Sequence, residues 1–238
     1  NECLPAPLTE QEKRLVSILE IVEVERHVPR IVTRYRYPGR KPLDRRALAR
    51  AFVAKVLYRY PTTIDLHRAL QSTANLRRIC GFGTADSLPS EATFSRAFAA
   101  FAAGKLGNVV HDALVTAYLS HELIGHISRD STAIVGREKP AKKTAKEPKT
   151  PRKRGRPAKG EQREATTLKR LDRQIDQSAE EGIGELPTVC DRGTKQNAKG
   201  YKTSWNGYKL HLDTNDIGLP ISALVTSASL HDSQVAIP

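Results

Sequence analysis

The hydrophobic pattern of this chain changes once, near Gly125, and the change limits the folds that the chain can adopt. Before it, apolar residues such as Leu15, Leu19 and Val22 recur every three or four positions, which is the period of an amphipathic helix. Caps and helix breakers divide this part into five expected helices: 9–25 with Thr9 as cap, a helix from Asp44 that Pro61 ends, one from a Thr62/Asp65 capping box to Gly81, one from Ser90 to 102, and one over 106–117. Residues 1–120 are therefore predicted to form an all-helical region.

Segments with the composition of strands follow Gly125. One surrounds Asp130, a second covers 205–212 and a third covers 220–226, with hairpin-turn residues at 213–218 between the last two. Between the first two strands, residues 137–204 are expected to form a long insertion that is rich in Pro, Lys and Arg at first and contains one short helix near 161–181. The fold class is therefore predicted to be α+β.

The positive charge of the chain is concentrated in this insertion. The formal net charge is +13, and the segment 137–160 contains 11 Lys and Arg residues against two acids, Glu138 and Glu147. Such a tract indicates a polyanionic partner; a solvated linker is the alternative, and a membrane surface is disfavoured because nothing amphipathic accompanies the tract. No apolar run reaches the roughly 18 residues of a membrane span and no signal-peptide pattern is present, so we expect a cytoplasmic protein without membrane contact.

The run Lys153, Arg154, Gly155, Arg156, Pro157, with Lys159 after it, has the form of an AT-hook. In such a peptide the Arg side chains enter the narrow minor groove of A·T-rich DNA, where negative potential is concentrated; Gly permits close approach and Pro keeps the backbone extended. A basic linker with this sequence by accident is the alternative. One hook alone would bind weakly and with strong salt dependence.

The expected helices at 62–80 and 90–102 are a candidate helix-turn-helix. The second helix would then present Thr93, Ser95 and Arg96 to the major groove, since its Phe residues occupy the other face. Any helical bundle gives a similar pattern, so a packing helix with an ordinary polar face is an equal alternative.

Asp130 is a lone carboxylate in a segment that reads as a buried strand. A buried Asp needs a cation or hydrogen-bond donors, so three roles stay open: metal ligand, strand-end cap and hydrogen-bonded core residue. Two-metal phosphoryl transfer needs several converging carboxylates. The later candidates are three aspartates, Asp213, Asp216 and Asp232. His211 and His231 are left unassigned, as polar residues at strand margins.

Six short motifs follow one another along nearly the whole chain. They are Pro42–Leu48, Leu88–Arg96, Arg129–Ile134, Lys199–Tyr201, Trp205–Asp213 and Ser227–Ser233. This ordered set resembles bacterial insertion-sequence transposases of the DDE type, in the broad IS-four and IS-five group, and it is far more specific than any one motif.

The resemblance implies two domains. A helical DNA-binding domain at 1–120 would recognise element ends, and a partial ribonuclease-H-like, mixed-sheet domain at 121–238 would carry the basic, disordered, AT-hook-like insertion at 137–204. In such enzymes three acidic residues hold Mg²⁺ or Mn²⁺ and cut DNA, and Asp130 matches the first of them.

The rest of the acidic set is expected elsewhere. Asp232 belongs to a His-Asp-Ser motif and is not promoted to the second acid. The second Asp and the Glu would lie beyond Pro238, so this chain should be inactive alone.

The expected function is DNA transposition, by binding of double-stranded element ends and, in the complete protein, metal-dependent strand cleavage and transfer. A non-catalytic DNA-binding repressor or remnant of a truncated transposase is the rival interpretation, and a host nuclease of the same fold is a third. By resemblance, the protein would form homo-oligomers on the bacterial nucleoid.

Overall fold

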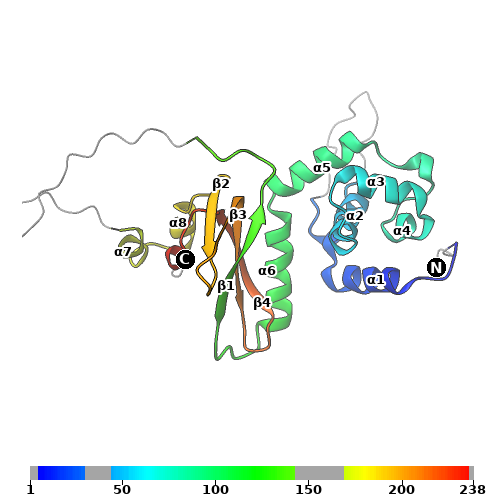
Figure 1. The fold of residues 1–238 in the computed structure, drawn as a ribbon. Coiled ribbons are helices and arrows are strands. Elements are labelled where there is room, and N and C mark those ends of the chain that lie inside the picture. The colour runs from blue at the N-terminus through cyan, green and yellow to red at the C-terminus, as the bar shows by residue number, and fades with distance from the viewer. Residues whose placement is uncertain (1–4, 30–43, 143–168, 236–238) are drawn as a thin grey trace, which may run out of the picture. The chain divides into compact units, whose positions relative to one another are not determined.

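The computed structural model describes residues 5–29, 44–142 and 169–235, and the chain divides into two compact units, Asn1–Glu122 and Leu123–Pro238. The first unit is helical and the second contains an antiparallel sheet (Figure 1), which confirms the predicted α+β class. No helix in these ranges is long and apolar enough to cross a bilayer.

The helical unit contains α1 (Glu10–Val22), α2 (Arg46–Leu57), α3 (Thr63–Ser72), α4 (Ala74–Ile79), α5 (Glu91–Ala103) and α6 (Leu106–Leu119), with 3₁₀ turns η1 (Val24–Arg26) and η2 (Ala85–Ser87). The predicted starts at Thr9 and Thr62 are confirmed, because each threonine forms a capping box with the acid three residues later. The single helix predicted from 62 to 81 is wrong: Thr73 is extended, with φ −106° and ψ 104°, and separates α3 from α4.

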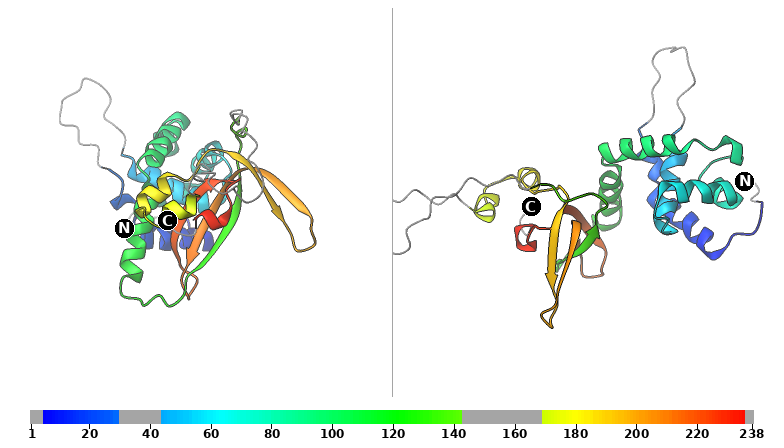
Figure 2. Two further views of the ribbon diagram at one scale, coloured as in Figure 1. Left: turned by 90° about the vertical axis from the view of Figure 1, so that its left-hand side faces the viewer. Right: turned by 45° about the horizontal axis from the view of Figure 1, so that its top comes forward.

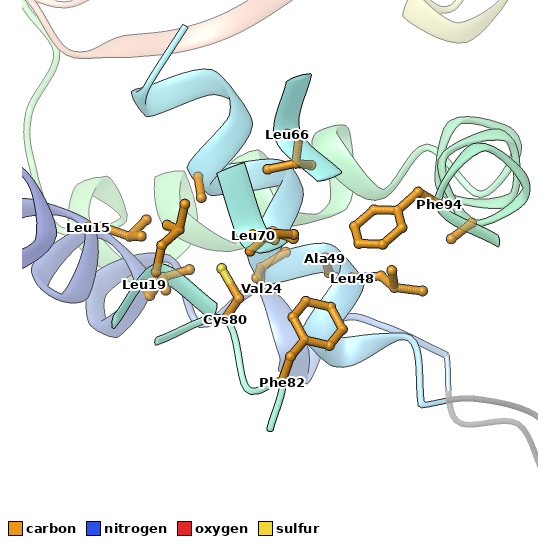
Figure 3. Packing of buried hydrophobic residues seen from close by; sticks show 14 of the residues in the cluster. Leu15, Leu19, Val24, Leu48, Ala49, Leu66, Leu70, Cys80, Phe82 and Phe94 are labelled. Carbon is orange, nitrogen blue, oxygen red and sulfur yellow. The ribbon is translucent and has the colours of Figure 1, made fainter. Parts of the chain in front are cut away.

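One apolar core holds these helices together. Leu15 of α1, Leu70 of α3 and Phe94 of α5 are all 0% exposed, and Figure 3 shows their side chains in one cluster with residues of α2. Phe52 of α2 lies edge-on to Phe94, with ring centroids 6.2 Å apart. The faces buried here are the ones that the helical periodicity predicts.

The sheet unit contains β1 (Ser128–Val135), β2 (Asp191–Gln196), β3 (Lys202–Thr214) and β4 (Pro220–Ser227), with short helices α7 (Arg170–Gln174), α8 (Ala179–Gly184) and η3 (Asp232–Val235). The second half of β3 pairs with β1 and β4, and its first half pairs with β2. Every pairing among the described strands is antiparallel, so this part of the sheet is not mixed. The sequence predicts three strands; β2 is a fourth, and its polar composition conceals it.

The insertion predicted at 137–204 is shorter in the structure, because β2 and the start of β3 occupy its last part. Val135 at the end of β1 and Asp191 at the start of β2 both pair with Gly207 of β3. The segment between β1 and β2 therefore begins and ends beside the same residue of β3. Gly207 has a φ of +148°, and an added Cβ would collide with the carbonyl of Ile134. This crowded junction therefore requires glycine.

The base of the insertion is closed by a backbone hydrogen bond. Ala141 N donates to Cys190 O at 2.9 Å. Beyond this base, α7 and α8 replace the single helix predicted near 161–181. Residues 143–168 lie outside the described part of the chain.

Candidate functional site

β1 presents Asp130 on one face of the sheet and its two neighbours on the other, because side chains alternate along a strand. Asp130 lies opposite Leu212 in the register with β3. Its carboxylate is exposed, and Oδ1 accepts a hydrogen bond from Ser131 N at 2.7 Å. The prediction of a buried strand is wrong, because β1 pairs only with β3 in the described part of the chain and exposes most of its side chains.

Arg129 and Asp213 form a bidentate ion pair on the opposite face. Arg129 Nε donates to Asp213 Oδ1 at 2.5 Å and Nη2 donates to Oδ2 at 2.7 Å. Ser222 Oγ of β4 donates to the same carboxylate at 2.6 Å, and Arg129 Nη1 donates to Val235 O. The hydrogen bonds from Arg129 hold the pKa of the Asp213 carboxyl below its usual value. Asp213 is therefore a structural carboxylate that joins β1, β3 and β4.

Asp232 also joins separate segments. Its Oδ1 accepts a hydrogen bond from Lys209 Nζ of β3 and its Oδ2 accepts one from Ser131 Oγ of β1, both at 2.9 Å. Burial alone would raise the pKa of Asp232, but the hydrogen bonds from Lys209 and Ser131 outweigh burial and lower it. The His-Asp-Ser motif thus anchors the start of η3 to β1 and β3.

The two histidines differ in their surroundings. His211 lies inside β3 rather than at a strand margin, is 2% exposed, and places Nε2 2.9 Å from Thr226 Oγ1. Burial lowers the pKa of His211. His231 is exposed at the start of η3, with Nδ1 2.8 Å from Ser233 Oγ. Neither contact requires a metal ion.

The candidate aspartates do not converge. Asp213 and Asp232 bond to side chains on the sheet face opposite Asp130, and Asp216, in the β3–β4 turn, accepts a hydrogen bond from Gly125 N at 3.1 Å. The described residues contain no group of three or more His, Cys, Asp or Glu side chains that could hold a metal ion. They do not fit a two-metal site, and Asp130 contributes one exposed carboxylate.

The predicted DNA-contact residues of α5 lie at the surface. Ser95 and Arg96 are exposed and Thr93 is half-buried. Arg96 Nε donates to a backbone carbonyl one turn earlier in α5, at 3.2 Å. The connection from α4 to α5, residues 80–90, includes η2 and is longer than the three or four residues typical of a helix-turn-helix turn.

The AT-hook residues, Lys153, Arg154, Gly155, Arg156, Pro157 and Lys159, lie outside the described residues. The structure adds Arg129 and Ser131, which the sequence reasoning did not single out. Strand alternation was the available signal: it places the side chains of both neighbours of Asp130 on the sheet face opposite to that of Asp130.

No curated protein and no solved structure matches this chain. Residues 4–100, which include α1 to α4 and most of α5, match the family described as Transposase domain (DUF772). Most of the helical unit therefore matches a transposase domain, which supports a transposase and a role in transposition, with DNA as the partner that this family implies in general.

Proposed function

We propose that the chain acts in DNA transposition as an insertion-sequence transposase of the DDE type, within the IS-four and IS-five group. In this proposal the helical unit binds element ends and the sheet unit belongs to a ribonuclease-H-like strand-cleaving domain. The observation that carries the proposal is the match of residues 4–100 to a transposase domain. The local excess of positive charge over 137–160 supports it, because phosphate neutralisation supplies much of the affinity of DNA-binding proteins.

Two parts of the protein are proposed to contact the DNA. In the helical unit, Phe94 anchors one face of α5 in the core and leaves Ser95 and Arg96 on the surface. In the insertion, the AT-hook residues at 153–159 would contact the minor groove of A·T-rich DNA. A homo-oligomer acting on paired element ends is part of the same proposal.

Asp130 is proposed as one carboxylate of an acidic set that holds Mg²⁺ or Mn²⁺. Its exposure supports this role, because a single backbone hydrogen bond leaves the carboxylate accessible, whereas Arg129 and Ser222 occupy that of Asp213. The described residues do not complete a metal site, so we assign no chemical step to a metal.

A non-catalytic DNA-binding repressor is the second candidate. The observation that favours it is the use of Asp213 and Asp232 as structural anchors, while Asp130 belongs to no group of three or more possible metal ligands in the described part of the chain. Both candidates bind DNA, and only cleavage distinguishes them.

The first test is a binding selection. The purified chain is incubated with fragments of its own genome, and the retained fragments are sequenced. Enrichment of the sequences that flank its gene would support recognition of element ends; uniform recovery across the genome would contradict it.

The second test is cleavage of an end-labelled duplex that carries the enriched sequence, by the protein expressed from its whole gene, with Mg²⁺ or Mn²⁺ added. Nicking by this protein that is lost in its Asp130→Asn variant would support the transposase. Binding without nicking would favour the repressor, and nicking that persists in Asp130→Asn would contradict the role of Asp130.

A further inference from the structure

β2 and the first half of β3 form a two-stranded ribbon that extends beyond the rest of the sheet (Figure 2). Its turn is fixed by side-chain and backbone contacts. Asn197 Oδ1 accepts hydrogen bonds from Lys199 N at 3.0 Å and Tyr201 N at 2.9 Å, and Gly200 takes a φ of +84°. The ribbon is therefore a defined hairpin rather than an irregular loop.

One face of this ribbon is polar and exposed. Cross-strand partners share a face of an antiparallel pair, and the side chains of alternate residues lie on it. The register therefore places six exposed residues together, which we call the ribbon face: Arg192, Thr194 and Gln196 of β2 and Lys202, Ser204 and Asn206 of β3. Thr194 Oγ1 and Ser204 Oγ lie 3.0 Å apart and link the strands at its centre.

The opposite face attaches the ribbon to the rest of the unit. Gly193 and Trp205 pair across the strands, and an added Cβ at Gly193 would lie 2.7 Å from Ala228 O and 2.7 Å from the indole of Trp205. Trp205 Nε1 donates to Tyr208 O at 3.1 Å, which fixes the ring. The ribbon face is thus the side left open to a ligand.

The ribbon face carries charge of one sign. The one acid of β2, Asp191, starts the strand and alternates onto the opposite face with Gly193. No Asp or Glu occurs from Arg192 to Leu212, and within the described residues neither Arg192 nor Lys202 takes part in an ion pair. Apolar side chains are absent from the ribbon face, unlike the centre of a protein–protein interface. Two cations and four hydroxyl or amide side chains are instead suited to phosphate oxygens and base edges.

We propose that the ribbon face is a DNA-contact surface that enters the major groove of double-stranded DNA. Arg192 and Lys202 contact phosphates, and the hydroxyl and amide side chains contact base edges. The major groove of B-form DNA admits a two-stranded ribbon, whereas that of A-form RNA is too deep and narrow. The inference rests on the proposed function only in taking DNA as the partner, and it needs neither Asp130 nor the AT-hook residues.

The test compares two double variants of the full chain with the wild type. Arg192→Gln/Lys202→Gln removes two charges from the ribbon face. Lys195→Gln/Lys199→Gln removes two charges from the same hairpin, at the opposite face and the turn. Binding to a fluorescent 30-base-pair duplex of mixed sequence is measured by anisotropy across a salt series, and far-UV circular dichroism and Trp205 emission report folding.

The ribbon-face variant is expected to bind about 60-fold more weakly at 0.1 M salt and to lower the slope of log K against log salt by about 1.8, because each lost phosphate contact contributes about 0.9 to that slope. The Lys195→Gln/Lys199→Gln control should change affinity by less than about fivefold. The charge-preserving variant Arg192→Lys/Lys202→Arg should retain the wild-type slope, which shows that loss of charge rather than altered folding caused the effect.

Equal weakening by both neutral variants would overturn the inference in favour of unspecific electrostatics. Unchanged binding by the ribbon-face variant would overturn it while leaving the proposed function intact, since the wild type would still bind. Tighter binding of duplex RNA than of duplex DNA would overturn the assignment of the groove. A wild type that binds no nucleic acid would contradict the proposed function itself.

Discussion

The two units of this protein are stabilised in different ways. The helical unit buries a large apolar cluster to which α1, α2, α3, α4 and α5 all contribute. In the described part of the sheet unit the buried apolar cluster consists of Leu186, Leu230 and Val235, and polar networks centred on Asp213 and Asp232 join the strands. An extensive apolar core is the main feature of the first unit, whereas hydrogen-bonded charge pairs connect the strands of the second.

This difference follows from the residue patterns. Helical periodicity gives each helix one apolar stripe, and the stripes meet in one core. Along the second half of β3, charged and apolar residues alternate as Lys209, Leu210, His211, Leu212 and Asp213, so one sheet face is polar even where it is covered. Buried polar groups must then find partners within the unit.

The largest expected effect tests the apolar side of the comparison. Phe94→Ala should lower the free energy of unfolding of the helical unit by about 3–5 kcal/mol, because the ring is fully buried and its removal leaves a cavity. Urea unfolding followed by circular dichroism at 222 nm measures this loss. Phe98→Ala, one turn later in α5 and 57% exposed, is the matched control and should cost about 1 kcal/mol or less. Equal losses would refute the assignment of Phe94 to the core.

The next effect tests the charged side. Arg129→Ala should destabilise the sheet unit by about 2–4 kcal/mol, because it leaves the carboxylate of Asp213 buried without its cation. Trp205 is the single tryptophan of the chain and lies in β3, so urea unfolding followed by its fluorescence reports on this unit.

Lys13→Ala is the control for this variant. It removes an exposed ion pair with Glu10 in the helical unit, at 2.7 Å, and should cost less than about 0.5 kcal/mol when unfolding is followed by circular dichroism at 222 nm. A loss below 1 kcal/mol for Arg129→Ala would show that the ion pair is not a main support of the sheet.

The helical unit was predicted well from sequence because its signals are local. Thr9 and Thr62 cap helices through contacts within one turn, and the buried residues Leu15, Leu70 and Phe94 follow the helical period. The break at Thr73 was missed, since no Gly or Pro marks it.

The sheet unit was predicted less well because its contacts are distant in sequence. Arg129 pairs with Asp213 across 84 residues and Ser131 bonds to Asp232 across 101. No local pattern reports such partners, and the apolar run near Asp130 suggested burial that an edge strand does not provide. The ribbon face was missed for a related reason. β2 has almost no apolar residues, so its sequence shows no strand periodicity, and only its pairing with β3 identifies it as a strand.

Acid pH should lower the stability of the sheet unit through His211 and Asp213. Burial lowers the pKa of His211, so the folded sheet unit favours the neutral ring; that stability is complete above about pH 6.5 and is lost as pH falls below it. The pKa of Asp213 is lowered mainly by Arg129, so its contribution is present above about pH 4 and is lost as pH falls through its folded-state pKa.

The measurement is the urea midpoint of Trp205 fluorescence from pH 8 to pH 3. We expect a first decline below about pH 6.5 and a steeper one below about pH 4. His211→Gln should remove the first decline and keep the second. A midpoint that stays constant from pH 7 to pH 5 in the wild type would contradict the role of His211.

The smallest expected effect concerns Asp130. Its side chain is exposed, whereas that of Asp213 is buried, although both residues lie on paired strands of one sheet. Asp130→Asn should change the stability of the sheet unit by less than about 0.5 kcal/mol, because the side chain is exposed and an amide oxygen can still accept the hydrogen bond from Ser131 N. Asp213→Asn, measured in the same way, should cost about 2 kcal/mol because it removes the charge that pairs with Arg129. If Asp130→Asn instead destabilises the unit as much as Asp213→Asn, Asp130 is a structural carboxylate. A carboxylate that can be neutralised without loss of stability is free for a function outside the fold, and that freedom is what its proposed role in strand cleavage requires.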